Sequence, residues 1–328
     1  MRLTAAFQRI GGMIKSLANP PFFIYRIYHY ANKYIPLGLA SSIFKHNRKE
    51  YEKSGIKDVL IETHDGSGQS VHPTMAYWNN FYWLAITPYP YGMEEYENPG
   101  IYSCKTLDAF KIHTPYIKKQ ECHKQGTHLS DPALVVFDER LYCFFRSTEN
   151  RKKNTLLYSV YDDTEDSWGI PKYLFESSDD LLLSPAFVKG SSLIMFHADW
   201  REGKGHLFKT IVGQDAVLGE KKEVIIKGLE PGLSIWHLDI ISINCTRELQ
   251  GLFLMRNEKK RGIRHRLYYA NSFDEGETWA IVKECYYPET VIKEMKFPYK
   301  SCFIPGESKI ILSFRDKKDR NRLTIVDL

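Results

Sequence analysis

The sequence predicts an all-β fold, a single five-bladed β-propeller over residues 58–328 that follows a short, partly helical extension over residues 1–57. The main observation is a short sequence phrase that occurs five times. Its heads follow one another at intervals of 59, 53, 55 and 61 residues, and they are His72, Asp131, Ser184, Asp239 and Lys300. Each head leads into a second apolar run, and a period of about 40 to 60 residues with about four strands per unit is typical of propeller blades.

The composition supports this fold class. The 328 residues fit one large all-β domain, and aromatic residues make up 14% of the chain, with 21 Tyr and 18 Phe. Tyr and Phe suit half-buried, pleated surfaces, so their enrichment favours strands. The same side chains could also stack on sugar rings, an alternative that we rank second.

Two stretches show how a blade is built. In the second repeat, strands are predicted over residues 131–137, 141–146 and 155–161, and a fourth begins at Trp168. In the fourth repeat, Ser272–Trp279 matches SxDxGxTW, the Asp-box turn of sialidase-like and related propellers. Its glycine suits a tight hairpin, its Ser and Asp are expected to bond local amides, and its Trp to pack between strands. This motif indicates fold and carries no chemistry.

Positive charge is concentrated at the N-terminus. Residues 1–57 contain ten Lys or Arg against Glu50 and Glu52, whereas the whole chain has a net charge of +5, so residues 58–328 total about −3. The propeller therefore has no basic footprint for nucleic acid. The basic segment also contains Phe22, Phe23 and Ile24. It could bind an anionic membrane surface or form a helical cap on the propeller, and both alternatives remain open.

The chain lacks features of export. It has no apolar signal region with a cleavage site and no apolar run long enough for a membrane-spanning helix. We therefore expect a cytoplasmic protein, with peripheral attachment at the inner face of the membrane as an option. We expect its cysteines to be reduced core residues, because no CxxC pair is present. They are Cys104, Cys122, Cys143, Cys245, Cys285 and Cys302.

Carboxylates near the propeller axis are the candidate catalytic groups. Asp131 and Asp239 stand at strand heads, and Glu97 lies on the long loop after the second strand of blade one. Two carboxyl groups are what glycosidic chemistry needs, one to assist the leaving oxygen and one to act as base or nucleophile. The alternative for Asp131 is a structural residue that binds backbone amides at a strand start.

Arginine follows the second strand in three repeats, at Arg146, Arg256 and Arg315, as if at one position of the blade. Guanidinium forks bind carboxylate or phosphate in a bidentate manner, so these residues are predicted to bind substrate. Alternatively, each could brace a neighbouring blade. The other predicted substrate-binding residues are His72, His197, Trp236 and His237. No His, Cys and Asp cluster has the spacing of a metal site, so no metal or cofactor is predicted.

These features resemble the five-bladed propeller glycosidases of the family 43, 62, 32 and 68 group. The resemblance covers about residues 58–328 and rests on the blade count, the Asp-box-like turn and the phrases 72–73, 130–132 and 236–239. It implies action on furanosides or pentosides, with Asp131 as the aspartate that tunes or orients. Two positions depart from it: His72 stands where the group has an aspartate, and Ser184 where it has an acidic glutamate.

The departures affect the expected reaction. We expect a carbohydrate-active enzyme that makes or breaks a glycosidic bond, furanosyl or pentosyl, on a cell-surface polysaccharide or glycolipid. Glycosyl transfer in polysaccharide biosynthesis is slightly favoured, because an activated donor brings its own leaving group. The alternatives are a glycoside hydrolase of the family 43 type, with Glu97 as the acid, and a non-catalytic, lectin-like sugar-binding propeller.

Overall fold

The structure, a computed structural model, describes residues 48–107, 111–114, 128–149, 153–177, 181–213, 217–243, 247–257 and 265–328. Most of the basic extension therefore lies outside the described residues, and so do Cys122 and Cys245. The other four cysteines are buried and have free thiols. No helix within the described ranges is both long and apolar enough to cross a membrane.

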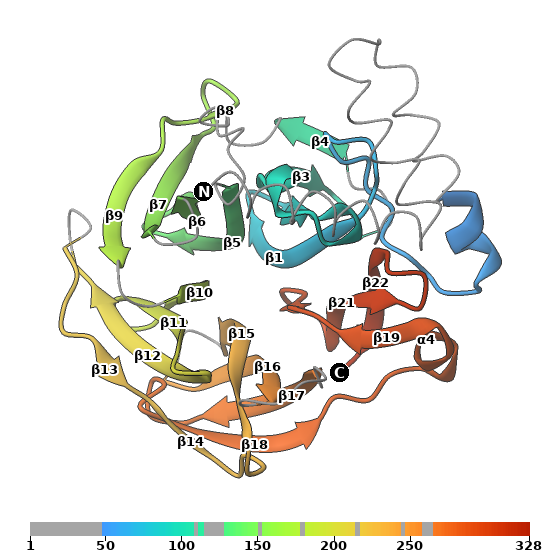
Figure 1. Cartoon of the computed structure of the whole chain (residues 1–328). Coiled ribbons are helices and arrows are strands. Elements are labelled where there is room, and N and C mark those ends of the chain that lie inside the picture. Colours follow the sequence, from blue (N-terminus) through green and yellow to red (C-terminus); the bar gives the residue numbers. More distant parts are fainter. Residues whose placement is uncertain are drawn as a thin grey trace, which may run out of the picture.

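Five antiparallel sheets are arranged in a ring, which confirms the five-bladed propeller (Figure 1). Blade one contains β1 (Ser70–Trp78), β2 (Phe81–Pro88), β3 (Gly100–Cys104) and β4 (Lys111–Thr114). Blade two contains β5 (His128–Phe137), β6 (Arg140–Glu149), β7 (Lys153–Asp162), β8 (Ser167–Trp168) and β9 (Lys172–Ser177). Blade three contains β10 (Leu181–Lys189), β11 (Leu193–Arg201), β12 (Lys204–Val212) and β13 (Lys222–Glu223).

The last two blades are less regular. Blade four contains β15 (Leu233–Ser242), β16 (Leu249–Asn257), β17 (His265–Ser272) and β18 (Thr278–Glu284), with β14 (Ile225–Lys227) parallel to β18. Blade five contains β19 (Met295–Pro298), β20 (Cys302–Phe303), β21 (Lys309–Asp316) and β22 (Asn321–Asp327). Three short helices lie in loops: η1 (Pro90–Gly92), η2 (Glu94–Tyr96) and α4 (Glu289–Glu294).

The ring closes on blade five. Asp58 forms a bridge with Thr324 of β22, and Val59 donates a backbone hydrogen bond to Leu323, so this stretch extends blade five and blade one begins only at β1. The side chain of Arg322 is fully buried and binds the Asp58 carboxylate at 2.5 Å. Its guanidinium also lies over the ring of Tyr51, 4.6 Å from the centroid. The described part of the extension is therefore attached to the last blade through its outer strand.

Each interface between neighbouring blades has its own hydrophobic core. The five clusters join blades one and two, two and three, three and four, four and five, and five and one. In the interface of blades two and three, for example, the rings of Phe144 and Phe187 stack at 3.6 Å. The alternating apolar positions of the inner strands supply these contacts, because every blade buries both faces.

The turn Ser272–Trp279 has the hydrogen bonds expected from its sequence. Ser272 Oγ accepts a bond from the Gly276 amide at 2.8 Å, and Asp274 Oδ1 accepts one from the Thr278 amide at 2.9 Å. Trp279 is fully buried in the cluster between blades three and four. The Trp279 side chain of this motif thus packs the outer strands of blade four against blade three.

A β-bulge interrupts the inner strand of each of the first three blades. At the bulges, His72, Asp131 and Ser184 have left-handed backbone angles, with φ of 54°, 53° and 44°. Non-glycine residues rarely adopt this conformation, and bulges re-aim side chains near functional sites. The strand-head phrase of the sequence is therefore the place where each blade departs from regular pleating.

Candidate functional site

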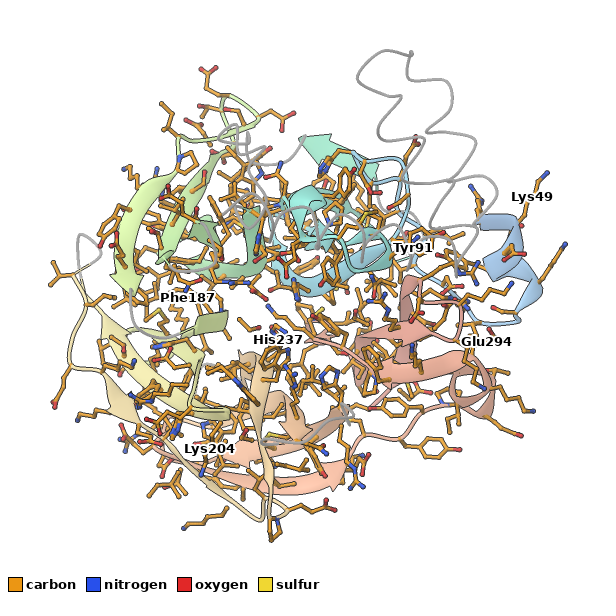
Figure 2. All side chains as sticks on the ribbon, in the orientation of Figure 1. Lys49, Tyr91, Phe187, Lys204, His237 and Glu294 are labelled. Carbon is orange, nitrogen blue, oxygen red and sulfur yellow. The ribbon has the colours of Figure 1, made fainter. Side chains whose placement is uncertain are left out.

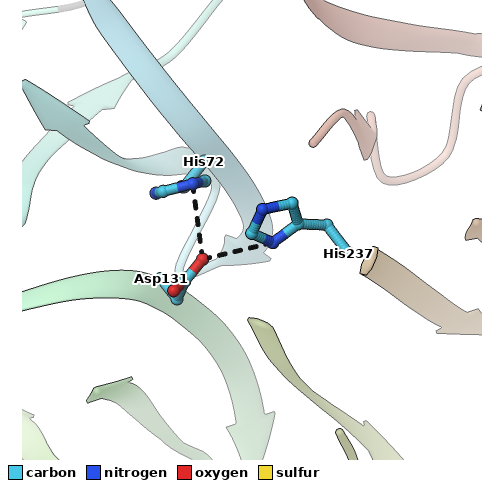
Figure 3. A group of neighbouring side chains, drawn as sticks. All are labelled: His72, Asp131 and His237. Carbon is cyan, nitrogen blue, oxygen red and sulfur yellow. Dashed lines mark ion pairs between the residues drawn. The ribbon is translucent and has the colours of Figure 1, made fainter. Parts of the chain in front are cut away.

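His72, Asp131 and His237 come together at the centre of the ring (Figure 3). Asp131 Oδ1 lies 3.5 Å from His72 Nε2 and 3.5 Å from His237 Nδ1. All three side chains are buried, with at most 3% of their surface exposed. His237 lies near the middle of the molecule, whereas Lys204 and Glu294 lie towards its rim (Figure 2). The three residues come from β1, β5 and β15, three separate blades.

Arg146 fixes the other side of the aspartate. Its Nε donates to Asp131 Oδ2 at 2.9 Å, and its Nη2 lies 2.8 Å from the same oxygen. Further bonds run from Nη2 to Ser130 Oγ and from Nη1 to Thr148 Oγ1, both at 2.8 Å. Because Arg146 occupies Oδ2, the other oxygen, Oδ1, faces the two imidazoles.

Burial and charge set the protonation of this cluster. Burial alone would raise the pKa of Asp131, but the neighbouring histidines and Arg146 outweigh it and hold that pKa well below its usual range. Burial lowers the pKa of His72 to about 4 and that of His237 well below its usual value, against the opposing charge of Asp131. At neutral pH the cluster therefore consists of one carboxylate and two neutral imidazoles.

This set of groups fits a divalent metal ion. Their ligand atoms all lie within 4.8 Å of one another. A tetrahedral ion with bonds of about 2.1 Å separates its ligand atoms by about 3.4 Å, close to the 3.5 Å seen on either side of Asp131 Oδ1. Among the described residues, no hydrogen bond reaches Asp131 Oδ1 or any ring nitrogen of His72 and His237. Buried polar atoms without partners are costly, and a cation among them would remove that cost.

The sequence predicted no metal site, whereas the structure brings together three side chains that could hold an ion. His72 and His237 were predicted as substrate-binding residues and Asp131 as catalytic, but the three together form a candidate metal centre. Ligand spacing along the chain could not reveal it, because each ligand belongs to a different blade. The signal available in the sequence was the recurrent strand head, with a polar residue at or next to the bulge.

Tyr299 and Lys300 of blade five lie beside the His72–Asp131–His237 cluster. The ring of Tyr299 lies 5.3 Å from that of His72 and 5.3 Å from that of His237. Lys300 is 1% exposed and donates from Nζ to the Pro132 carbonyl at 3.0 Å. Burial lowers the pKa of Lys300, while Asp131 and Asp239 oppose that shift. Neither residue was predicted as part of the site, although Lys300 was recognised as a strand head.

Glu97 and His128 form a second buried pair beside the cluster. Glu97 Oε2 lies 3.6 Å from His128 Nε2, and the two side chains are 5% and 6% exposed. Burial raises the pKa of Glu97 well above its usual value, Arg146 opposes the shift, and Asp131 adds to it. Glu97 is thus close enough to interact with the charges of both residues. His128, three residues before Asp131 on β5, was missed in the sequence.

Asp239 is not a member of the His72–Asp131–His237 cluster. Asp239 lies two residues after His237 on β15. Its Oδ2 accepts a hydrogen bond from the Phe303 amide at 3.0 Å. Burial raises its pKa to about 7, which Lys300 opposes. The charge of Asp131 acts on the pKa of Glu97, and the charges of Asp131 and Asp239 both act on the pKa of Lys300.

His197 also lies away from the axis. Its ring packs between Phe175 and Phe208, with centroids 5.9 and 5.7 Å away, and its Nε2 lies 3.4 Å from Asp199 Oδ1. These contacts place it in the layer between blades two and three. Its predicted contact with substrate has no support in this position.

The structure gives the three predicted arginines different partners. Arg146 pairs in register with Ser130, immediately before the bulge, and binds Asp131. Arg256 pairs in register with Ser234 and packs on Trp236. Arg315 pairs in register with Phe297 and binds Asp319 at 3.3 Å.

Comparisons with known proteins agree with the fold. The structure is similar to an N-acetylgalactosamine deacetylase from F. plautii in complex with blood group B trisaccharide (TM-score 0.63, 16% identity), covering 83% of this chain and 92% of that one. It is also similar to an endo-arabinase from Bacteroides thetaiotaomicron VPI-5482 (TM-score 0.58, 13% identity; 83% and 97% covered). An α-L-arabinanase from Cellvibrio cellulosa complexed with arabinohexaose has a TM-score of 0.55 at 14% identity, with 79% and 92% covered.

These likenesses define the class of fold. The chain is a five-bladed β-propeller whose structural neighbours include a family 43 endo-arabinanase, as the sequence resemblance implied, and also a deacetylase, which it did not imply. No protein-family model and no curated protein sequence matches the chain. At identities of 8% to 16% the neighbours establish the fold alone.

Proposed function

We propose that this protein is a carbohydrate-active hydrolase, and that it removes an acyl group from a sugar at the His72–Asp131–His237 cluster. The observation that carries the proposal is the buried set of two imidazoles and one carboxylate that point at one another without hydrogen bonds among the described residues. Its residues match the three-ligand sites of hydrolytic metal enzymes, which leave a position for water or substrate. One structural neighbour is named as a sugar deacetylase, which supports this reaction class.

The chemistry follows from the groups present. A divalent metal held by His72, Asp131 and His237 would polarise the acyl carbonyl and make water a stronger nucleophile. Water adds to the carbonyl carbon and loses a proton to solvent, the bond from that carbon to the sugar nitrogen breaks, and the nitrogen takes a proton, so that a carboxylic acid and an amine are released. Glu97 can supply that proton, because burial raises its pKa well above the usual value and keeps the carboxyl protonated. Arg146 positions Asp131.

Cleavage of a glycosidic bond is the second candidate. Asp131 and Glu97 are two carboxyl groups whose pKa values are shifted in opposite directions, the arrangement that assigns one as base and one as acid. The arabinanase neighbours support it. Against it, His72 and Ser184 stand where the glycosidase group has carboxylates. The neighbours support hydrolysis rather than the glycosyl transfer favoured from sequence.

The decisive test is a substrate screen with metal-reconstituted protein. Acetate release from N-acetylated sugars and oligosaccharides is measured beside nitrophenol release from aryl arabinofuranosides. The variants are His237→Ala, Asp131→Asn and, as a matched control, His206→Ala, whose imidazole pairs with Glu223 towards the rim. We expect acetate release that the first two variants lose by several orders of magnitude and the control retains.

Other outcomes assign the alternatives. Release of nitrophenol without acetate would replace deacylation with glycosidase activity. Sugar binding without turnover of any substrate, unaffected by Asp131→Asn, would indicate a lectin-like module.

A further inference from the structure

Arg256 is an arginine near the central site whose charge has no carboxylate partner among the described residues. Arg146 is bound to Asp131 and Arg315 to Asp319, whereas no hydrogen bond or ion pair of Arg256 is present in the described part of the chain. A partly buried guanidinium without an acceptor is unusual, because its five N–H groups form strong bonds to oxyanions.

Aromatic side chains hold this guanidinium in place. Its Cζ lies 4.3 Å from the ring centroid of Trp236 and 5.3 Å from that of Trp200. The two indoles are nearly perpendicular, with centroids 4.7 Å apart at 81°, so Arg256 occupies the corner between them. Cation–π contacts cover the faces of a guanidinium and leave the N–H groups at its edge available.

The corner between Trp200 and Trp236 is connected to the central cluster by ring contacts and by strand pairing. Trp236 immediately precedes His237 and meets its ring edge to face at 5.6 Å. Arg256 pairs in register with His265, whose ring lies 6.1 Å from that of Tyr299, the neighbour of His72 and His237. His265 also lines an open pocket of about 300 Å³ between blades four and five. Arg256 is thus connected to the proposed reaction centre through Trp236 on one side and through His265 and Tyr299 on the other.

We propose that Arg256, held between Trp200 and Trp236, is a subsite for an anionic substituent of the substrate glycan, a carboxylate or a phosphate. The inference rests on the proposed function, because it concerns a substituent beside the acyl group that is removed. All three side chains are on strands of the propeller, β16, β11 and β15, so the subsite is preorganised. Preorganisation reduces the entropy lost on binding.

Binding is tested by indole fluorescence of the full chain, because two Trp rings report directly on this subsite. The probes are N-acetylglucosamine, its 6-phosphate, N-acetylneuraminic acid and inorganic phosphate; the second and third distinguish phosphate from carboxylate. We expect at least one anionic sugar to bind about ten- to hundred-fold more tightly than N-acetylglucosamine, as charge-assisted bonds allow. Arg256→Met should remove that preference and Arg256→Lys should retain part of it. Arg247→Gln, an exposed arginine, is the control.

The results separate this inference from the proposed function. Equal binding of neutral and anionic sugars, or a preference that survives Arg256→Met in a protein of unchanged thermal stability, would overturn the subsite. Acetate release that depends on His237 would in that case leave the proposed function intact. Conversely, an anion preference that depends on Arg256, without acetate release from any substrate, would support the subsite and contradict the deacylase.

Discussion

Arg146 binds Asp131 through one carboxylate oxygen and leaves the other facing two imidazoles. Partners of this kind orient metal-binding side chains, and their loss typically weakens metal binding about 10- to 100-fold. Arg146→Lys cannot reproduce the fork, so we expect zinc affinity to fall by that factor, measured by calorimetric titration. Arg140→Lys, at the exposed first residue of β6, is the matched control. Unchanged zinc affinity in Arg146→Lys would show that Arg146 has only a structural role.

The raised pKa of Asp239 leads to a prediction about the pH dependence of stability. Burial raises its pKa to about 7, so the folded protein holds this proton more tightly than the unfolded chain, whose carboxyl titrates at about 4. The free energy of unfolding should therefore fall as pH rises between these values, by up to about 1.4 kcal/mol per pH unit. Asp239→Asn keeps an oxygen for the Phe303 amide and should lose this slope in urea denaturation. Parallel pH profiles for the two proteins would contradict a raised pKa.

Glu97 makes a prediction about the pH dependence of activity. A proton donor must be protonated, and burial raises the pKa of Glu97 well above its usual value, so kcat/KM should fall on the alkaline side of that raised pKa. Glu97→Gln should lower kcat by about 10²- to 10⁴-fold and remove this alkaline limb. A limb that persists in Glu97→Gln would assign the titration to another group.

The sequence determined much of this fold but less of the site. Repeated apolar runs revealed five blades, because each blade must bury both faces. The sequence identified four of the site residues, because polar residues at strand heads or on a long loop can be recognised from sequence alone. They are His72, Glu97, Asp131 and His237. Their gathering at the propeller axis was also predicted, but the set of potential metal ligands was not, because its three members belong to different blades. The partners of Arg146, Arg256 and Arg315 were not predictable either, because they lie elsewhere in the sequence, and His128 was hidden within an apolar strand start.

The basic extension makes a prediction that rests on sequence. Ten Lys or Arg occur within residues 1–57, and each basic residue near an anionic surface contributes about 1 kcal/mol. We expect the full chain to sediment with phosphatidylglycerol vesicles at low salt and to be released at high salt. A chain without residues 1–45 should not sediment. Equal sedimentation of both chains, or none by the full chain, would support the helical cap instead.

Metal binding by the central cluster tests the account most directly. Zinc is titrated into metal-free protein at pH 7, with His72→Ala, Asp131→Asn, His237→Ala and the control His206→Ala in parallel. The account predicts one tight zinc ion per chain, an affinity at least 100-fold lower in each of the three cluster variants, and no change in the control. Because burial lowers the pKa of His72 to about 4, wild-type binding should also persist at pH 5.5. Absence of zinc binding, or binding that survives all three substitutions, would contradict the proposed centre.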